Sequence, residues 1–223
     1  MEYDLTLFEK GLEELGIALS LEQKKQFITY YEYLVEKNKV MNLTAITEYN
    51  EVILKHFLDS LSIVKVGSFD QKKLTGKSVI DIGTGAGFPG IPLKIAFPEL
   101  KITLLDSLNK RVNFLNEVIE MLGLKDVTAV HGRAEDYAKQ KEHREKYDFC
   151  VSRAVANLST LSEYCIPFVK EGGSFISYKS GKIDEELSQA ENAEKILGGK
   201  VQDVVKFPLM DTDMDRSFVV IKN

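Results

Sequence analysis

The sequence predicts an α/β protein in which a mostly parallel sheet, covered by helices on both faces, follows an N-terminal helical segment. Three observations carry this prediction. Residues 4 to 66 show only helical patterning, the chain beyond residue 67 alternates short apolar strands with helical segments, and the first strand ends in a glycine-rich turn. Such alternation is typical of βαβ units and a parallel sheet.

Composition narrows the class of protein. The chain has 223 residues, of which 44% are hydrophobic and 28% charged, as in an ordinary globular domain with at most a small appendage. The net charge of −5 argues against a polyanion partner overall, but it permits a local basic surface. The N-terminus lacks the pattern of a signal peptide, and no stretch approaches the roughly 20 apolar residues of a membrane span. We therefore expect a cytoplasmic protein.

Three helices are predicted in the N-terminal segment. The first carries Leu5, Phe8, Leu12 and Leu15 at helical spacing and ends at Gly16. Ser20 and Gln23 form a capping box for the second helix, and Thr47 is the expected N-cap of the third. The third helix places polar side chains at positions i, i+3 and i+4, which are His56, Asp59 and Ser60. Side chains at this spacing are close enough to hydrogen-bond one another.

A polar, turn-rich stretch at residues 67–77 is the expected boundary between a helical cap (1–66) and a sheet domain (67–223). Five strands are predicted in the alternating region: Val79–Ile82, Ile102–Leu105, Val127–Val130, Phe149–Val151 and Ser174–Tyr178. The chain then ends differently, because Val201–Phe207 and Ser217–Ile221 are joined only by an acidic turn. This pattern predicts a closing hairpin.

The glycine-rich turn is the predicted cofactor site. Residues 78–90 read Ser-Val-Ile-Asp-Ile-Gly-Thr-Gly-Ala-Gly-Phe-Pro-Gly, and a helix is expected to begin near Pro92. Alternate glycines allow a ligand close to the backbone, and a helix N-terminus attracts an anionic group. The stretch from Gly85 to Gly90 also satisfies the dinucleotide fingerprint GxGxxG, which by itself is as often structural as functional.

Two carboxylates favour a different cofactor. Asp81 ends the first strand, where dinucleotide enzymes usually keep an apolar residue, and Asp106 ends the second, a position suited to ribose hydroxyls. The remaining chain is too short for a second mononucleotide half and a substrate domain. The set resembles the Asp/Glu-x-Gly-x-Gly-x-Gly motif of class I S-adenosylmethionine-dependent methyltransferases. That resemblance implies a Rossmann-like seven-stranded sheet whose last strand is antiparallel.

Later strand ends fit such a site. The third strand leads to Ala134 and Glu135, where a backbone N–H and a carboxylate would recognise an adenine edge, although a simple helix-start charge explains Glu135 equally well. Arg153 follows the fourth strand, over the expected position of the methyl group. The amine-methylating motif (Asp/Asn)-Pro-Pro-(Tyr/Phe) does not follow that strand. Cys150 and Cys165 are predicted to lie in the core, and no metal-ligand spacing is found.

Several motifs in order carry a more specific resemblance: Asn42-Leu43-Thr44-Ala45-Ile46, His56-x-x-Asp59-Ser60-Leu61, Asp81 to Gly90, Asp106-Ser107-x-x-Lys110-Arg111, Arg133-Ala134-Glu135 and Ser152-Arg153-Ala154. Together they resemble the bacterial small-subunit ribosomal RNA guanine-N7 methyltransferases, also called glucose-inhibited division protein B, from about residue 20 to about residue 180. At residues 178–181 the chain reads Tyr-Lys-Ser-Gly, where that family tends to have Lys-Gly.

The resemblance implies S-adenosylmethionine as cofactor, held by Gly83, Phe88, Ala134, Glu135 and Arg153, with Arg153 also positioning the reactants. The fold argument adds Gly85 and Asp106. Asn42, His56, Asp59, Ser60 and Lys179 are candidate substrate residues. The alternative for the first four is that they fix the helical cap to the sheet.

The implied reaction is methyl transfer to N7 of a guanine in 16S ribosomal RNA, on free RNA or on the small subunit, by a monomer without a metal. Guanine N7 has a lone pair and no proton, so no general base is expected. Candidate RNA contacts are Lys110, Arg111, residues 139–144, Lys179 and Lys182, each of which is otherwise a solvated surface charge. A class I methyltransferase for a protein or a small molecule, and a non-catalytic nucleotide-binding regulator, remain alternatives.

Overall fold

The computed structural model describes residues 3–153, 156–181, 183–188, 199–210 and 212–223. Ala154 of the Ser-Arg-Ala motif and the candidate RNA contact Lys182 lie outside these residues. The first two helices form as predicted. Helix α1 (Thr6–Leu15) ends at Gly16, whose φ is 65°, and α2 (Leu21–Met41) begins with the capping box of Ser20 and Gln23.

The third predicted helix is wrong in two respects. Its N-cap is Glu48 rather than Thr47, because the Glu48 carboxylate accepts the backbone N–H groups of the first turn. The segment is also not one α-helix but four consecutive pieces: α3 (Tyr49–Val52), the π-helix η1 (Ile53–Leu58), α4 (Asp59–Leu61) and the 3-10 helix η2 (Ser62–Lys65). A π-turn changes the angular spacing of the side chains that it carries. The short 3-10 helix η3 (Gln71–Lys73) lies in the predicted boundary.

The sheet has seven strands in the order β3-β2-β1-β4-β5-β7-β6. They are β1 (Ser78–Ile82), β2 (Lys101–Asp106), β3 (Val127–His131), β4 (Tyr147–Arg153), β5 (Val169–Ser180), β6 (Lys200–Pro208) and β7 (Asp215–Lys222). The first five pair in parallel, and β7 is antiparallel to both β5 and β6. The predicted sheet with a closing hairpin is therefore confirmed, with β5 longer than expected.

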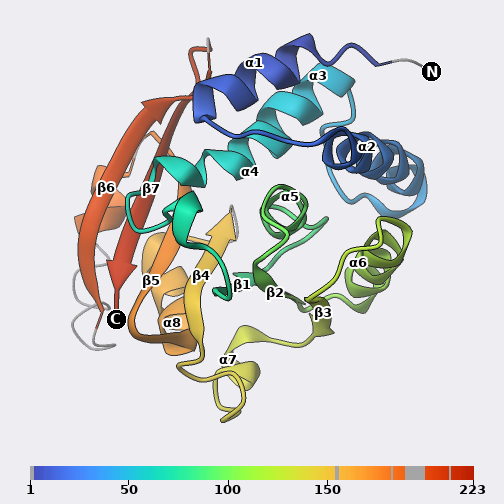
Figure 1. The fold of residues 1–223 in the computed structure, drawn as a ribbon. Helices are drawn as coiled ribbons and strands as arrows, with labels where there is room; N and C mark the ends of the chain where they lie inside the picture. The colour runs from blue at the N-terminus through green and yellow to red at the C-terminus, as the bar shows by residue number, and fades with distance from the viewer. Residues whose placement is uncertain (1–2, 154–155, 182, 189–198, 211) are drawn as a thin grey trace.

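Helices cover both faces of this sheet (Figure 1). One face carries α5 (Gly90–Ala96), α6 (Asn109–Met121) and, outside them, the N-terminal helices, while α7 (Ala134–Tyr137), α8 (Leu158–Cys165) and the 3-10 helix η4 (Ile166–Phe168) lie on the other. Helix α5 begins at Gly90, two residues before the expected Pro92.

Two hydrophobic clusters form the core. One joins the N-terminal helices to the sheet, since Phe27 and Tyr30 belong to the same cluster as Val79 and Phe218. The other lies on the opposite face and contains both cysteines, which are fully buried as predicted. The cap thus packs directly on the sheet, and its last helical segment reaches the carboxyl ends of the strands.

Candidate active site at the carboxyl ends of the strands

Two adjoining cavities lie beyond the strands at the position expected of a ligand in an open α/β sheet. Their volumes are about 260 and 380 Å³, and Gly83, Asp106 and Ser107 line both. Every predicted cofactor residue lines one or both of them: Gly83, Gly85, Phe88, Asp106, Ala134, Glu135 and Arg153. The fold thus brings together residues that end or follow four different strands.

The glycine loop presents open backbone to the larger cavity. Gly83, Gly85 and Gly87 have φ values of 69°, 60° and 100°, which only glycine adopts without strain. A Cβ added at Gly85 would meet no atom within 4 Å, whereas one at Gly87 would lie 2.6 Å from Ile91. Gly85 therefore leaves room for a ligand, and Gly87 is required for packing. This open cradle fits a nucleoside cofactor.

Asp81 and Asp106 both hold the loop, but only Asp106 lines the cavities. The buried Asp81 carboxylate accepts hydrogen bonds from Thr84 Oγ1 (2.7 Å) and from the Gly90 N–H (2.9 Å) through Oδ2. Among the described residues its Oδ1 has no hydrogen-bond partner, and burial raises the pKa of Asp81 to about 7. Asp106 accepts the Gly85 N–H (2.8 Å) and lines both cavities, as a ribose-binding carboxylate would.

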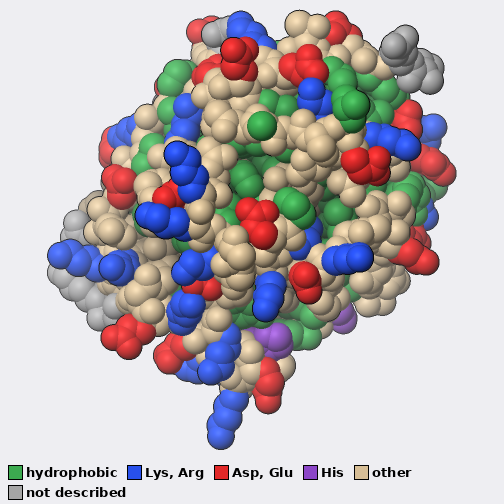
Figure 2. Space-filling view, viewed as in Figure 1, with side chains coloured by type: hydrophobic (Ala, Val, Ile, Leu, Met, Phe, Trp, Pro, Cys, Tyr) green, Lys and Arg blue, Asp and Glu red, His purple; other side chains and the backbone are tan. Residues whose placement is uncertain are grey.

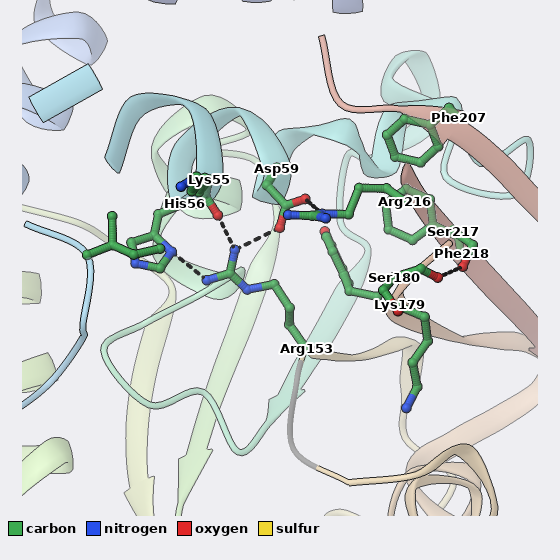
Figure 3. A pocket seen from close by; sticks show the side chains of 12 residues that line it. Lys55, His56, Asp59, Arg153, Lys179, Ser180, Phe207, Arg216, Ser217 and Phe218 are labelled. Atoms are coloured by element: carbon green, nitrogen blue, oxygen red, sulfur yellow. Dashed lines mark hydrogen bonds and ion pairs between the residues drawn. The ribbon is translucent and has the colours of Figure 1, made fainter. Parts of the chain in front are cut away.

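Arg153 lies where the larger of these cavities meets a third one (Figure 3). Its guanidinium donates to the Lys55 carbonyl (3.0 Å) and to Asp59 Oδ2 (2.9 Å), and NH2 lies 3.0 Å from His56 Nδ1. The same guanidinium stands 5.1 Å from the centre of the Phe88 ring. The cap and the glycine loop together fix the position of this charge.

His56 is held as a neutral imidazole with a defined tautomer. Burial, reinforced by the Arg153 charge, lowers the pKa of His56 to about 3. Because a guanidinium only donates, Nδ1 accepts from Arg153, and the Nε2–H donates to Thr44 Oγ1 at 2.8 Å. The ring also stacks on Phe88 with centroids 4.4 Å apart. Both nitrogens of His56 are thus engaged.

The third cavity has a volume of about 440 Å³ and lies beside the closing hairpin (Figure 3). Asp59 lies in its wall and pairs with two arginines, through Oδ2 with Arg153 and through Oδ1 with Arg216 Nε, each at 2.9 Å. Sequence reasoning missed Arg216 and Thr44. No local signal marks Arg216, because it lies 157 positions from Asp59 and only the antiparallel placement of β7 brings the two together.

The other candidate substrate residues have different environments. Asn42 is the exposed C-cap of α2, with a φ of 51°. Ser60 is fully buried; its Oγ donates to the His56 carbonyl, and its own carbonyl accepts from the Tyr178 hydroxyl at 2.6 Å. Lys179 lines the third cavity and pairs with Glu186 at 2.7 Å. Ser60 thus ties the cap to β5.

Within the part of the chain that the structure describes, no group of three or more His, Cys, Asp and Glu side chains is arranged to hold a metal ion. No described helix is both long enough and apolar enough to cross a membrane.

Solved structures of low identity share the fold. MtNAS in complex with MTA and tNA aligns with a TM-score of 0.58 at 17% identity, over 97% of this chain and 81% of that one. TYW2 of M. jannaschii in complex with AdoMet aligns with a TM-score of 0.53 at 15% identity, over 69% and 74%. At these identities the likeness concerns the fold alone.

Sequence relatives are much closer. A ribosomal RNA small subunit methyltransferase G of Lachnoclostridium phytofermentans is 58% identical over 219 residues, which is 98% of this chain and 89% of the relative. The protein of the same name from Clostridium botulinum (strain Loch Maree) is 50% identical over 222 residues, covering 100% and 91%. A family model, GidB, described as rRNA small subunit methyltransferase G, matches residues 23–214. The chain therefore belongs to the GidB family.

Proposed function

We propose that this protein transfers a methyl group from S-adenosylmethionine to N7 of a guanine in 16S ribosomal RNA. The observation that carries the proposal is the pair of adjoining cavities lined by every predicted cofactor residue, in a chain that belongs to this family. In the proposal Ala134 and Glu135 bind the adenine, Asp106 the ribose, and the loop from Gly83 to Phe88 the methionine part.

When bound, S-adenosylmethionine supplies a sulfonium methyl group, and transfer to N7 breaks the C–S bond as the N–C bond forms, so that the positive charge moves to the base without loss of a proton. The protein then has to align the two reactants and exclude water. A role for His56 as general base is not part of the proposal, since Arg153 occupies its only lone pair. His56 and Asp59 instead position Arg153.

RNA binding by an acidic protein requires a local basic surface. Lysine and arginine side chains alternate with acidic ones on the face shown in Figure 2 and are most frequent along its lower left, on the side of the closing strands. A ribosomal substrate supports a cytoplasmic location, which is part of the proposal. Since residues of one chain line the cavities, we propose that a monomer is active.

Two tests separate this function from the alternatives. Calorimetry should show binding of S-adenosylmethionine and not of NAD. Methyl transfer should then be measured on free 16S RNA and on small subunits from cells lacking the enzyme, with strand cleavage at N7-methylguanine as readout. Binding of the cofactor without methylation of either RNA would support a methyltransferase for another substrate, or a regulator.

Replacing Arg153 by Ala should abolish methyl transfer while the fold survives. The fold is expected to persist because Arg216 still pairs with the Asp59 carboxylate, which keeps that buried charge compensated. Circular dichroism and the melting temperature report on folding, and radiolabel transfer reports on activity. Full activity in a folded Arg153→Ala protein would remove Arg153 from the site.

A further inference from the structure

The third cavity is continuous with the cofactor site but has no part in holding the cofactor as proposed above. It shares Arg153 and His56 with the cavity of the glycine loop. The rest of its wall comes from the N-terminal segment, which supplies Lys55 and Asp59, from the end of β5 and from the β6–β7 hairpin. A methyl acceptor must reach the methyl group from the side opposite the departing sulfur. A cavity that meets the cofactor site at Arg153 is placed for that approach.

The wall contributed by the hairpin is aromatic. Phe207 is half-buried and stacks on the buried Phe218, with centroids 5.5 Å apart and planes inclined by 20°. The ring of Tyr178 packs edge-on against Phe218, with ring centroids 4.7 Å apart. Lys65 Nζ lies 5.4 Å from the centre of the Phe207 ring, so a cation already neighbours this ring. Bases that are taken out of a nucleic acid are commonly stacked on aromatic side chains of this kind.

The charge of the wall is positive. Four basic side chains line the cavity, which are Lys55, Lys179, Arg153 and Arg216, together with a single carboxylate, that of Asp59. Asp59 pairs with both arginines, whereas each lysine pairs with a glutamate outside the lining, Lys55 with Glu51 and Lys179 with Glu186. His56 adds no charge, because its pKa is lowered to about 3. An aromatic wall surrounded by cations matches a nucleotide, which has a planar base and an anionic phosphate, better than it matches a neutral or cationic acceptor.

The volume agrees with that ligand. Pockets that bind small molecules commonly enclose roughly 300–1,000 Å³, and the cavity holds about 440 Å³. Phe207 and Arg216 are direct cross-strand partners in the hairpin, so one structural unit supplies both the ring and the cation. Arg216 and Phe218 also lie beyond the region matched by the family model, which ends at residue 214.

We propose that the third cavity binds the acceptor guanine nucleotide, flipped out of the RNA, with its base stacked on Phe207 and its phosphate bound by Arg216. The inference rests on the proposed function and names the site at which its substrate is held. Arg216 has a second task here, because its pairing with Asp59 also fixes Arg153 between the two reactants.

The first test is kinetic. Phe207→Leu should raise the KM for small ribosomal subunits about tenfold through loss of stacking, with the Kd for S-adenosylmethionine unchanged and with recovery in Phe207→Tyr. The matched control is Tyr33→Leu, because Tyr33 is another half-buried ring stacked on a buried one, Phe114, and lies outside the three cavities. An unchanged KM in Phe207→Leu, or an equal rise in Tyr33→Leu, would overturn the proposal.

A second test does not depend on catalysis. Guanosine 5′-monophosphate is titrated into protein saturated with S-adenosylhomocysteine, and binding is followed by saturation-transfer NMR for the wild type, Phe207→Leu and Arg216→Gln. Binding should be present in the wild type and at least about tenfold weaker in both variants. If the nucleotide binds in this way and no RNA is methylated, the proposed function fails and the site stands. If the wild type methylates RNA and both variants bind guanosine 5′-monophosphate as tightly as the wild type, the assignment of the site is wrong while the proposed function stands.

Discussion

At the scale of single residues, the least expected feature is the buried carboxylate of Asp81. The sequence placed it at the end of the first strand and suggested a cofactor of the methyl-donor class, but the structure turns it inward to the glycine loop. Its raised pKa follows from burial that the hydrogen bonds of Thr84 and Gly90 offset only in part. Asp81 thus organises the cofactor loop without facing the cofactor.

The pKa of Asp81 predicts a pH dependence of stability. Its folded value of about 7 lies above the ordinary 3.8, so folding takes up a proton between these values. The stabilisation linked to that proton is complete below about pH 3.8 and is lost progressively as the pH rises from there through about 7, so that the last part of the loss falls above pH 6.5. Asp81→Asn should remove this loss, so the wild type should lose more stability than the variant between pH 6.5 and 8.5, as measured by urea unfolding.

The comparison with Asp81→Asn removes the contribution of the other shifted group of the site. His56 has a lowered pKa, so stability falls as the pH decreases through the ordinary value of 6.5, and this effect is common to the wild type and the variant. Asp148→Asn is the matched control, because Asp148 is a buried carboxylate whose pKa is held low by Lys170, Lys77 and Ser78. The free energy of unfolding of Asp148→Asn should change with pH between 6.5 and 8.5 with the same slope as that of the wild type. Equal slopes for wild type and Asp81→Asn would contradict the prediction.

At the scale of elements, the glycine loop separates positions that face the ligand from positions that face the core. An alanine at Gly85 would meet no neighbour, whereas one at Gly90 would place its Cβ 2.2 Å from Leu104 and 2.9 Å from Asp81 Oδ2. Gly85→Ala should therefore weaken binding of S-adenosylmethionine and cost about 1–2 kcal/mol of stability from its left-handed backbone. Gly90→Ala should chiefly destabilise, by about 1–3 kcal/mol or more.

Calorimetry and urea unfolding of the same variants test this contrast. Gly123→Ala provides the control, since Gly123 has nearly the same φ as Gly85 (62° against 60°) and equally open space. It should lose stability as Gly85→Ala does and bind the cofactor as the wild type does. Unimpaired cofactor binding by Gly85→Ala would show that the ligand stays away from this part of the loop.

The helix that carries His56 and Asp59 shows the limit of periodicity arguments. Spacing at i, i+3 and i+4 predicted hydrogen bonds among the side chains of His56, Asp59 and Ser60. Instead, the Ser60 hydroxyl donates to the backbone carbonyl of His56, and the side chains of His56 and Asp59 both bind Arg153. The spacing also did not foresee the π-helix, because π-turns are rare insertions within α-helices and the apolar period of the segment fits an ordinary α-helix. The Lys55 carbonyl, within the π-helix, binds Arg153 as well.

At the scale of the whole molecule, the cap and the sheet share one hydrophobic cluster. It contains side chains from both sides of the boundary expected after residue 66, among them Phe57 of the cap and Leu104 of the sheet. Tyr30 hydrogen-bonds the Ala86 carbonyl of the cofactor loop, so the cap also supports the site. The division into a cap (1–66) and a methyltransferase domain (67–223) stays a prediction about sequence organisation.

This continuity predicts that residues 67–223 do not fold alone. Removal of the cap exposes the apolar side of α5 and of the sheet in the folded fragment. Because this surface is then exposed in both the folded and the unfolded state, it no longer contributes to the free energy of folding. The fragment should show no cooperative urea transition and should bind a hydrophobic dye, whereas the full chain unfolds cooperatively. A cooperative transition in the fragment would show that the two parts are independent domains.

The sequence by itself determined the fold and the cofactor class. The evidence consists of local patterns: alternating strands and helices, the glycine turn, and the carboxylates that end the first two strands. Such patterns can be recognised in the sequence without knowledge of long-range contacts. Together with the family resemblance they also identified seven of the residues that line the two cavities: Gly83, Gly85, Phe88, Asp106, Ala134, Glu135 and Arg153.

Only the tertiary structure decided what each group touches. It turned Asp81 away from the cofactor cavities, gave His56 its neutral tautomer, and joined Asp59 to Arg153 and Arg216. The partners of that ion-pair cluster come from the cap, from β4 and from the last strand, and no pattern in the sequence encodes a contact across 157 positions. The physical reason is that burial and charge pairing depend on which elements the sheet places side by side, and that placement exists only in the folded chain.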